Sequence, residues 1–175
     1  ERPGEQVAAS AAIHAPDDRY VSRGAHKLIG AADDLRLSVA GRALDAGAST
    51  GGFTQVLLAR GCHEVFAVDV GSGQLAPELR ADPRVQLHER TNLRDLRLDD
   101  VGGVAVDLVV ADVSFISLRL LVGPLISVTR DDGWVLLLVK PQFEVGRELL
   151  GKGAVVHSPA DQLQAISGVI AAAGE

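Results

Sequence analysis

The stretch DAGASTGGFT, residues 45–54, is the part of the sequence whose residue types most clearly suggest a ligand site. Its glycines, Gly47, Gly51 and Gly52, permit a tight turn and a close approach of the backbone to a bound molecule. A helix that begins directly after such a turn offers unpaired backbone N–H groups. The stretch therefore predicts a ligand-binding loop, for which three kinds of chemistry compete.

Two of these chemistries have an observation against them. A dinucleotide-binding loop of the NAD type requires GxGxxG, and Ser49 stands where the second glycine should be. The hydrolase pattern GxSxG does match residues 47–51, and Asp112 and His157 follow in the order Ser, Asp, His. A serine esterase with Ser49 as its nucleophile therefore stays open as an alternative, although the chain is short for that fold.

The third chemistry is an S-adenosylmethionine pocket, in which an acidic residue ends a strand and a glycine turn lies against the methionine portion. Asp69 ends the next apolar run, where a carboxylate can accept hydrogen bonds from ribose hydroxyls. Because NAD enzymes use such an acid too, Asp69 alone does not separate the two cofactors. The residues of the first loop that we expect to contact the cofactor are Asp45, Gly47, Ala48, Ser49, Thr50, Gly51, Gly52 and Phe53.

Short apolar runs and amphipathic runs alternate along the chain and must position these residues. The alternation predicts right-handed crossovers and a doubly wound, mostly parallel α/β sheet, which binds ligands beyond the carboxyl ends of its strands. The predicted strands are 43–46, 64–68, 85–88, 106–111 and 134–139, and the predicted helices are 23–37, 53–60, 74–81, 116–128 and 160–173.

Composition narrows the class of protein. The 175 residues are 47% apolar but only 3% aromatic, which indicates one domain with an aliphatic core. A net charge of −6 argues against a domain that holds a polyanion by bulk electrostatics alone. A single cysteine, Cys62, excludes an internal disulfide, and no apolar run approaches the roughly 18 residues of a membrane span. We expect a cytoplasmic protein without membrane segments, with residues 1–19 as a flexible arm or linker before a domain at 20–175.

Five motifs in a fixed order carry a family resemblance: SRGAHK, DAGASTGGFT, ERTN, DLVVADVSFISL and LVKPQFEVG. With them the sequence resembles the FtsJ-like ribosomal RNA 2′-O-methyltransferases, most closely the TlyA or haemolysin-A group, over residues 20 to 157. The resemblance implies a Rossmann-like class I methyltransferase that uses S-adenosyl-L-methionine, and no metal, to methylate ribose 2′-hydroxyls of cytidines in ribosomal RNA or ribosomal subunits.

The same resemblance implies site residues. The family uses a Lys, Asp, Lys, Glu tetrad, and its first three members match Lys27, Asp112 and Lys140. Lys140 would remove the proton of the hydroxyl or hold its oxygen, Asp112 would orient Lys140 and the hydroxyl, and Lys27 would add positive potential. Asn92 stands where the family often has an Asp that contacts the adenine amino group; its carbonyl can still accept that contact, and Asp95 is the alternative acceptor.

Some parts of the family pattern are expected to lie outside this chain. The glutamate of the tetrad would follow Glu175, so we expect the domain to lack its final strands at the C-terminus. An N-terminal S4-like RNA-binding domain, which the family usually carries, is expected to be missing as well. Two further alternatives remain, a small-molecule methyltransferase and a non-enzymatic haemolysin, although no basic amphipathic stretch supports membrane lysis.

Overall fold

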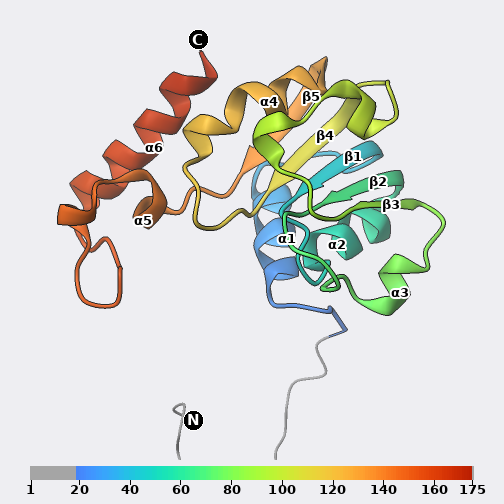
Figure 1. The fold of residues 1–175 in the computed structure, drawn as a ribbon, viewed down its shortest axis with the longest axis horizontal. Helices are drawn as coiled ribbons and strands as arrows, with labels where there is room; N and C mark the ends of the chain where they lie inside the picture. The colour runs from blue at the N-terminus through green and yellow to red at the C-terminus, as the bar shows by residue number, and fades with distance from the viewer. Residues whose placement is uncertain (1–18, 175) are drawn as a thin grey trace, which may run out of the picture.

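The computed structural model describes residues 19–174 and shows one parallel sheet with helices on both faces (Figure 1). The strand order is β3-β2-β1-β4-β5. This arrangement confirms the doubly wound, Rossmann-like α/β fold. The predicted N-terminal arm lies, apart from Arg19, outside the described residues. The strands are β1 (Gly41–Ala46), β2 (Cys62–Val68), β3 (Val85–His88), β4 (Val106–Ala111) and β5 (Thr129–Leu137).

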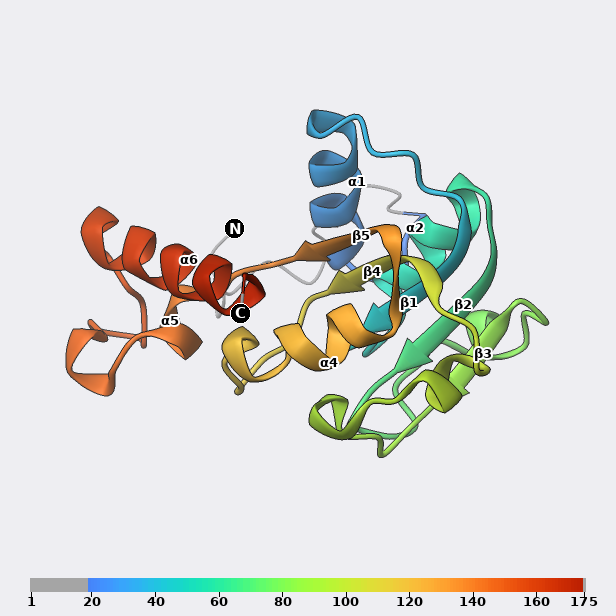
Figure 2. The ribbon, with the colours of Figure 1, turned by 90° about the horizontal axis from the view of Figure 1, so that it is seen from above.

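The helices form two layers, which Figure 2 shows from above. On one face, α1 (Gly24–Asp34), α2 (Gly52–Arg60) and α3 (Pro77–Arg80) cover a buried cluster that includes Leu57, Val65 and Val110. On the other face, α4 (Val122–Ser127) covers a second cluster. α5 (Pro141–Glu144) and α6 (Pro159–Ala173) lie beyond the end of β5, where α6 packs against α4. Because both faces are covered, the central strands are apolar on both sides.

The chain reverses its direction of winding between β1 and β4, the two central strands. Their register pairs Ala46 with Ala111, so both strands end at the same level. The next residues, Gly47 and Asp112, therefore emerge side by side, with the Asp112 N–H donating to the Ala46 carbonyl at 3.2 Å. This is the switch point of a doubly wound sheet, where ligands bind.

The main departures from the predicted elements lie in the C-terminal half. β5 begins at Thr129, five residues earlier than predicted, because Thr129 already pairs with Val106 of β4. The polar residues 130–133 that follow form an irregularity in this pairing opposite Asp107, and Arg130 pairs with the Asp107 carboxylate at 3.0 Å. The predicted helix 116–128 is split into a 3-10 helix, Leu118–Leu120, and α4. The predicted helix 23–37 ends at Asp34, and α5 was not predicted at all.

Candidate functional site

The loops after β1 and β4 touch at the switch point because residue 47 is a glycine. Gly47 has a φ of +87°, and a Cβ built there would lie 3.1 Å from the Asp112 carbonyl oxygen and 3.2 Å from a Val113 methyl group. Both values are tighter than ordinary contacts, and side chains rarely adopt such a φ. Glycine at this position therefore lets the first loop lie directly against Asp112.

Asp112 joins the two lysines that the resemblance assigned to the site. Lys27 Nζ donates to Asp112 Oδ2 at 2.9 Å, and Lys140 Nζ lies 2.7 Å from Asp112 Oδ1. Partial burial acts to raise the pKa of Asp112, but the hydrogen bonds and charges of Lys140 and Lys27 outweigh it, so the pKa is held below its usual value. Asp112 is therefore a charged carboxylate that holds two amines at one point.

The choice of lysine here is unusual for this chain. Of its 17 basic residues, only Lys27, Lys140 and Lys152 are lysines and the rest are arginines. Arginine stays charged at any physiological pH, whereas lysine can give up its proton when its surroundings favour the neutral form. Two of the three lysines in the chain therefore meet on one aspartate.

Separate elements carry the two lysines. Lys27 lies on α1, which is docked by buried Ala25 and Leu28 against α2. The docking is close because residue 52 is a glycine, where a Cβ would lie 3.1 Å from the Ala25 nitrogen. Lys140 precedes the first turn of α5, just after β5, and its side chain is less exposed than that of Lys27, 20% against 49%.

A cavity of about 540 Å³ opens beside this cluster and reaches across the ends of β1, β2 and β4. At its polar side, Asp69 Oδ2 accepts the Ser49 N–H at 2.8 Å, and Asp69 Oδ1 accepts the Gly71 N–H at 2.7 Å. Asn92 also lines the cavity, and its Oδ1 accepts the Arg94 N–H at 3.1 Å. The apolar side is formed by Val70, Leu93, Val113, Ile116 and Leu121.

A second cavity, of about 300 Å³, lies over the lysine cluster. Gly47, Ser49, Asp112 and Ser114 line both cavities, so the two spaces meet at the end of β4. Other predicted loop residues line only the second cavity: Ala48, Thr50, Gly52 and Phe53. Gly51 lines neither, because its Cα faces the side chains of Leu75 and Leu79.

Asp45 lies beneath the loop instead of at the surface of either cavity. It is 1% exposed, and its Oδ2 accepts the Thr54 hydroxyl at 2.6 Å, while its buried Oδ1 has no hydrogen-bond donor among the described residues. Burial raises the pKa of Asp45 to about 7, partly offset by the hydrogen bonds from Thr54 and reinforced by the charges of Asp112 and Asp69. Asp45 thus joins the end of β1 to the first turn of α2.

The residues of the esterase alternative do not come together. Ser49 Oγ lies 3.2 Å from Gln74 Oε1, while Asp112 binds the two lysines. His157 packs near Gly151, in the segment between α5 and α6, and lines neither cavity. Without a base beside Ser49, the GxSxG match is a coincidence of sequence.

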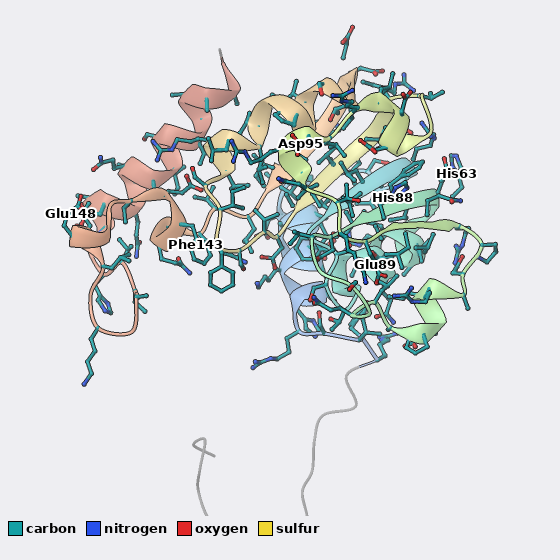
Figure 3. All side chains as sticks on the ribbon, in the orientation of Figure 1. His63, His88, Glu89, Asp95, Phe143 and Glu148 are labelled. Carbon is teal, nitrogen blue, oxygen red and sulfur yellow. The ribbon has the colours of Figure 1, made fainter. Side chains whose placement is uncertain are left out.

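Sequence reasoning missed two residues beside the cluster, Ser114 and Phe115. Ser114 Oγ accepts a hydrogen bond from Lys140 Nζ at 2.7 Å, and its place two residues after Asp112 was the only available signal. Phe115 is 92% exposed with a φ of +66°, and its ring lies 5.3 Å from that of Phe143. Figure 3 shows Phe143 on α5, whereas Glu148 lies farther from the sheet. The rim of the site therefore carries an aromatic pair.

Within residues 19–174, every helix is too short or too polar to cross a lipid bilayer. In the same part of the chain, no three His, Cys, Asp or Glu side chains are grouped so that they could hold a metal ion.

Comparison with known proteins gives consistent results. The chain is 58% identical over 149 residues to the 16S/23S rRNA (cytidine-2′-O)-methyltransferase TlyA of Mycobacterium tuberculosis (strain ATCC 25618 / H37Rv), covering 85% of this chain and 54% of that protein. The chain thus spans about half the length of this curated relative. A crystal structure of a provisionally named hemolysin from Lactococcus lactis matches with a TM-score of 0.84 and 42% identity, over 89% of this chain and 74% of the other.

A more distant solved structure shows the fold alone. An S-adenosylmethionine dependent methyltransferase from Mesorhizobium loti matches with a TM-score of 0.54 and 16% identity, over 68% of this chain and 56% of the other. The model of the FtsJ-like methyltransferase family matches residues 20–174, nearly the whole described chain. With the parallel sheet and the lysine–aspartate cluster at its switch point, this match shows that the chain belongs to the FtsJ-like methyltransferase family.

Proposed function

We propose that this protein transfers a methyl group from S-adenosylmethionine to a ribose 2′-hydroxyl, of cytidine, in ribosomal RNA. The observation that carries the proposal is the Lys27–Asp112–Lys140 cluster, which lies where the two cavities meet. The relative from M. tuberculosis, named as an rRNA (cytidine-2′-O)-methyltransferase, supports the choice of acceptor. Ribosomal RNA as the substrate would place the reaction in the cytoplasm.

The larger cavity fits the proposed cofactor. A carboxylate has about four lone-pair sites, and Asp69 uses two of them for backbone N–H groups, which leaves acceptors for ribose hydroxyls. Val70, Leu93 and Ile116 provide the apolar surroundings that a purine ring requires. Asn92 has an amide group at the same end of the cavity, although its carbonyl oxygen already accepts the Arg94 N–H. The volume of about 540 Å³ lies within the usual range for ligands of this size.

Lys140 is the residue best placed to handle the proton. When bound, S-adenosylmethionine supplies a methyl group on a sulfonium that a nucleophile can attack. A ribose hydroxyl is a weak nucleophile, so its O–H bond must break as the new O–C bond forms. For the hydroxyl proton to pass to Lys140 Nζ, the amine must first release a proton of its own to solvent, and the electron pair of the broken C–S bond would stay on the sulfur. Asp112 and Ser114 hold Lys140 Nζ by contacts of 2.7 Å each.

Asp112 and Lys27 act on charge and position. Asp112 remains ionised because its pKa is lowered, so it can orient the lysine amines in every step. Lys27 is half-exposed and lines the second cavity, where its charge favours the approach of a phosphate backbone. The Phe115 and Phe143 rings offer a surface on which a base can stack. Because the domain has a net charge of −6, we propose that a separate RNA-binding domain contributes most of the grip.

The test measures methyl transfer directly. The full-length gene product is incubated with methyl-labelled S-adenosylmethionine and either ribosomal subunits or free ribosomal RNA. A 2′-O-methyl group blocks alkaline cleavage of the adjacent linkage, so labelled dinucleotides that resist alkali identify the modified position. Nucleoside mass spectrometry then shows whether the base is cytosine. Label found on a base, on protein or on a small molecule would contradict the proposal.

Cofactor binding is measured separately by calorimetry. Asp69→Ala should weaken the binding of S-adenosylmethionine, whereas Asp95→Ala, a nearby acid that lines neither cavity, should leave it unchanged. If the unaltered protein binds no S-adenosylmethionine, or if Asp69→Ala binds it equally well, the assignment of the larger cavity fails.

A further inference from the structure

Glu144 is a buried carboxylate that neither cavity uses. Its side chain is 2% exposed and belongs to the last residue of α5. Glu144 Oε2 accepts the Ser117 hydroxyl at 2.6 Å, and Oε1 accepts the Leu118 N–H at 2.7 Å. Arg119 reaches the same residue, with Nη2 donating to the Glu144 carbonyl oxygen at 3.0 Å and Nε lying 3.5 Å from Oε2. The carboxylate is therefore fully paired and fixed in position.

These contacts join the two segments that carry the catalytic cluster. Lys140 lies one helical turn before Glu144, with the Phe143 N–H donating to the Lys140 carbonyl at 2.9 Å. Asp112 and Ser114 lie a few residues before Ser117, on the segment after β4. That segment is itself anchored in the core, because Leu118 is 1% exposed. The two segments are thus joined at two points, by Lys140 with Asp112 and by Glu144 with Ser117.

The need for a second joining point follows from the geometry of Lys140. Its residue lies beyond the end of β5, where strand pairing no longer fixes the backbone, and its amine sits at the end of four flexible carbons. The ion pair with Asp112 alone does not determine where the backbone lies. A second fixed point, one helical turn away, restricts the whole segment 140–144.

Resting on the proposed function, we infer that Glu144 is a positioning residue for Lys140: by binding Ser117 and Leu118 it holds the Lys140 turn at the distance from Asp112 that proton removal requires. It does not touch substrate, since it lines neither cavity. For the same reason it is distinct from the acid that would complete the tetrad.

The experiment compares three variants of the full-length protein. Glu144→Ala removes both acceptors, and Ser117→Ala removes one of the two contacts. Glu144→Gln retains both, because its carbonyl can accept the Leu118 N–H while its amide donates to Ser117 Oγ. We expect kcat to fall by about 10- to 100-fold in Glu144→Ala, less in Ser117→Ala and least in Glu144→Gln, since small misplacements of a reacting group carry costs of this size. The Kd for S-adenosylmethionine should change by less than about twofold in all three, because the cavity residues are untouched.

A matched control separates positioning from loss of stability. Asp107, at the opposite end of β4, also accepts a backbone N–H, from Arg42 at 2.8 Å, and an arginine, Arg130. Asp107→Ala should lower the thermal midpoint without changing kcat at 25 °C or the pH profile of kcat. Glu144→Ala should shift that pH profile, because the surroundings of Lys140 change.

Chemical labelling gives a readout that does not depend on turnover. An amine reagent followed by peptide mass spectrometry reports each of the three lysines of this sequence separately. Lys140 should react faster in Glu144→Ala, relative to Lys152, and return toward the original rate in Glu144→Gln.

Three results would overturn the inference: an unchanged kcat in Glu144→Ala, an equal loss in Asp107→Ala, or a Kd for S-adenosylmethionine that rises in parallel with the fall in kcat. If the unaltered protein transfers no methyl group, the proposed function fails instead, and the labelling of Lys140 still tests the positioning.

Discussion

Strand β4 has an aspartate near each end, and the two aspartates have different hydrogen-bond and ion-pair partners. Asp107, at the amino end, is bound by the Arg42 N–H and by the Arg130 guanidinium. Asp112, at the carboxyl end, is bound by two lysine amines and lies between two cavities. We therefore assign a structural role to Asp107, which pairs with arginine and backbone, and propose a chemical role for Asp112, whose lysine partners can exchange protons.

The arginines at the amino end make this contrast sharper. Arg42 donates to Glu64 at 2.7 Å and to the Val101 carbonyl at 2.7 Å, and its guanidinium lies 5.2 Å from the centre of the Phe66 ring. Arg42 thus uses most of its five N–H donors on protein acceptors, which are the Glu64 carboxylate and backbone carbonyls of the segment 101–105. The lysine cluster, in contrast, is partly open to solvent.

The largest effect should follow from removing Lys140. Lys140→Ala is expected to lower kcat by about 1,000-fold, a typical value for loss of a general base, while cofactor binding is retained. Arg130→Ala at the opposite end should leave kcat unchanged. Single-turnover methyl transfer to ribosomal RNA measures both variants, and Lys152→Ala serves as a lysine control. Equal activity of Lys140→Ala and Lys152→Ala would contradict a catalytic role for Lys140, and with it the proposed difference between the two ends of β4.

Replacing the aspartates themselves should produce the next largest difference. Asp112→Asn keeps the shape but loses the charge that holds the lysines, and we expect kcat to fall by about 100-fold. Asp107→Asn should keep kcat within about twofold and lower stability by about 1 kcal/mol. Kinetics and urea unfolding on the same samples check both values, and a reversed order would mean that the catalytic end has been misplaced.

A smaller effect, on stability alone, is expected from Arg42. Arg42→Ala should lower the free energy of unfolding by about 2 kcal/mol, because the backbone carbonyls that it binds lose a charged donor. Turnover measured well below the thermal midpoint should not change. A loss of turnover at full folding would show that the amino end influences the chemistry.

The last prediction concerns pH and Asp45. Because burial raises its pKa from the ordinary 3.8 to about 7, the folded protein binds more protons than the unfolded chain between these values. Stability should therefore fall as pH rises through this window, by at most about 1.4 kcal/mol per pH unit from this group. Asp45→Asn should flatten the slope, as chemical unfolding at pH 4.5, 5.5 and 6.5 would reveal. An unchanged slope would mean that Asp45 is ionised in the fold.

The sequence predicted the centre of the sheet better than its periphery. Residues 106–111 were predicted with the observed ends, because a run of buried aliphatic residues bounded by polar ones has few other interpretations. β5 was predicted too short, since Arg130, Asp131 and Asp132 look like a turn. They do interrupt the regular pairing with β4, but Thr129 before them pairs with Val106. Edge strands can carry such polar residues because one side of the backbone is unpaired.

The site shows a similar division. The family motifs predicted Lys27, Asp112 and Lys140, and the structure brings them together, while their chemical roles remain to be tested. Ser114 and Glu144 could not be singled out, because a serine or glutamate in a loop is usually a surface residue. Their significance depends on two segments, 112–118 and 138–144, meeting in space, which no local pattern encodes.

The position of Trp134 on β5 gives the protein a built-in optical reporter. It is the sole tryptophan of the chain, it is 61% exposed, and it lines neither cavity of the site. Its fluorescence should therefore be almost silent to cofactor binding but should shift to shorter wavelength when another surface covers this edge of the sheet. Contact of another surface with the sheet edge can thus be followed by tryptophan emission, and cofactor binding in the cavities by calorimetry, on the same preparation.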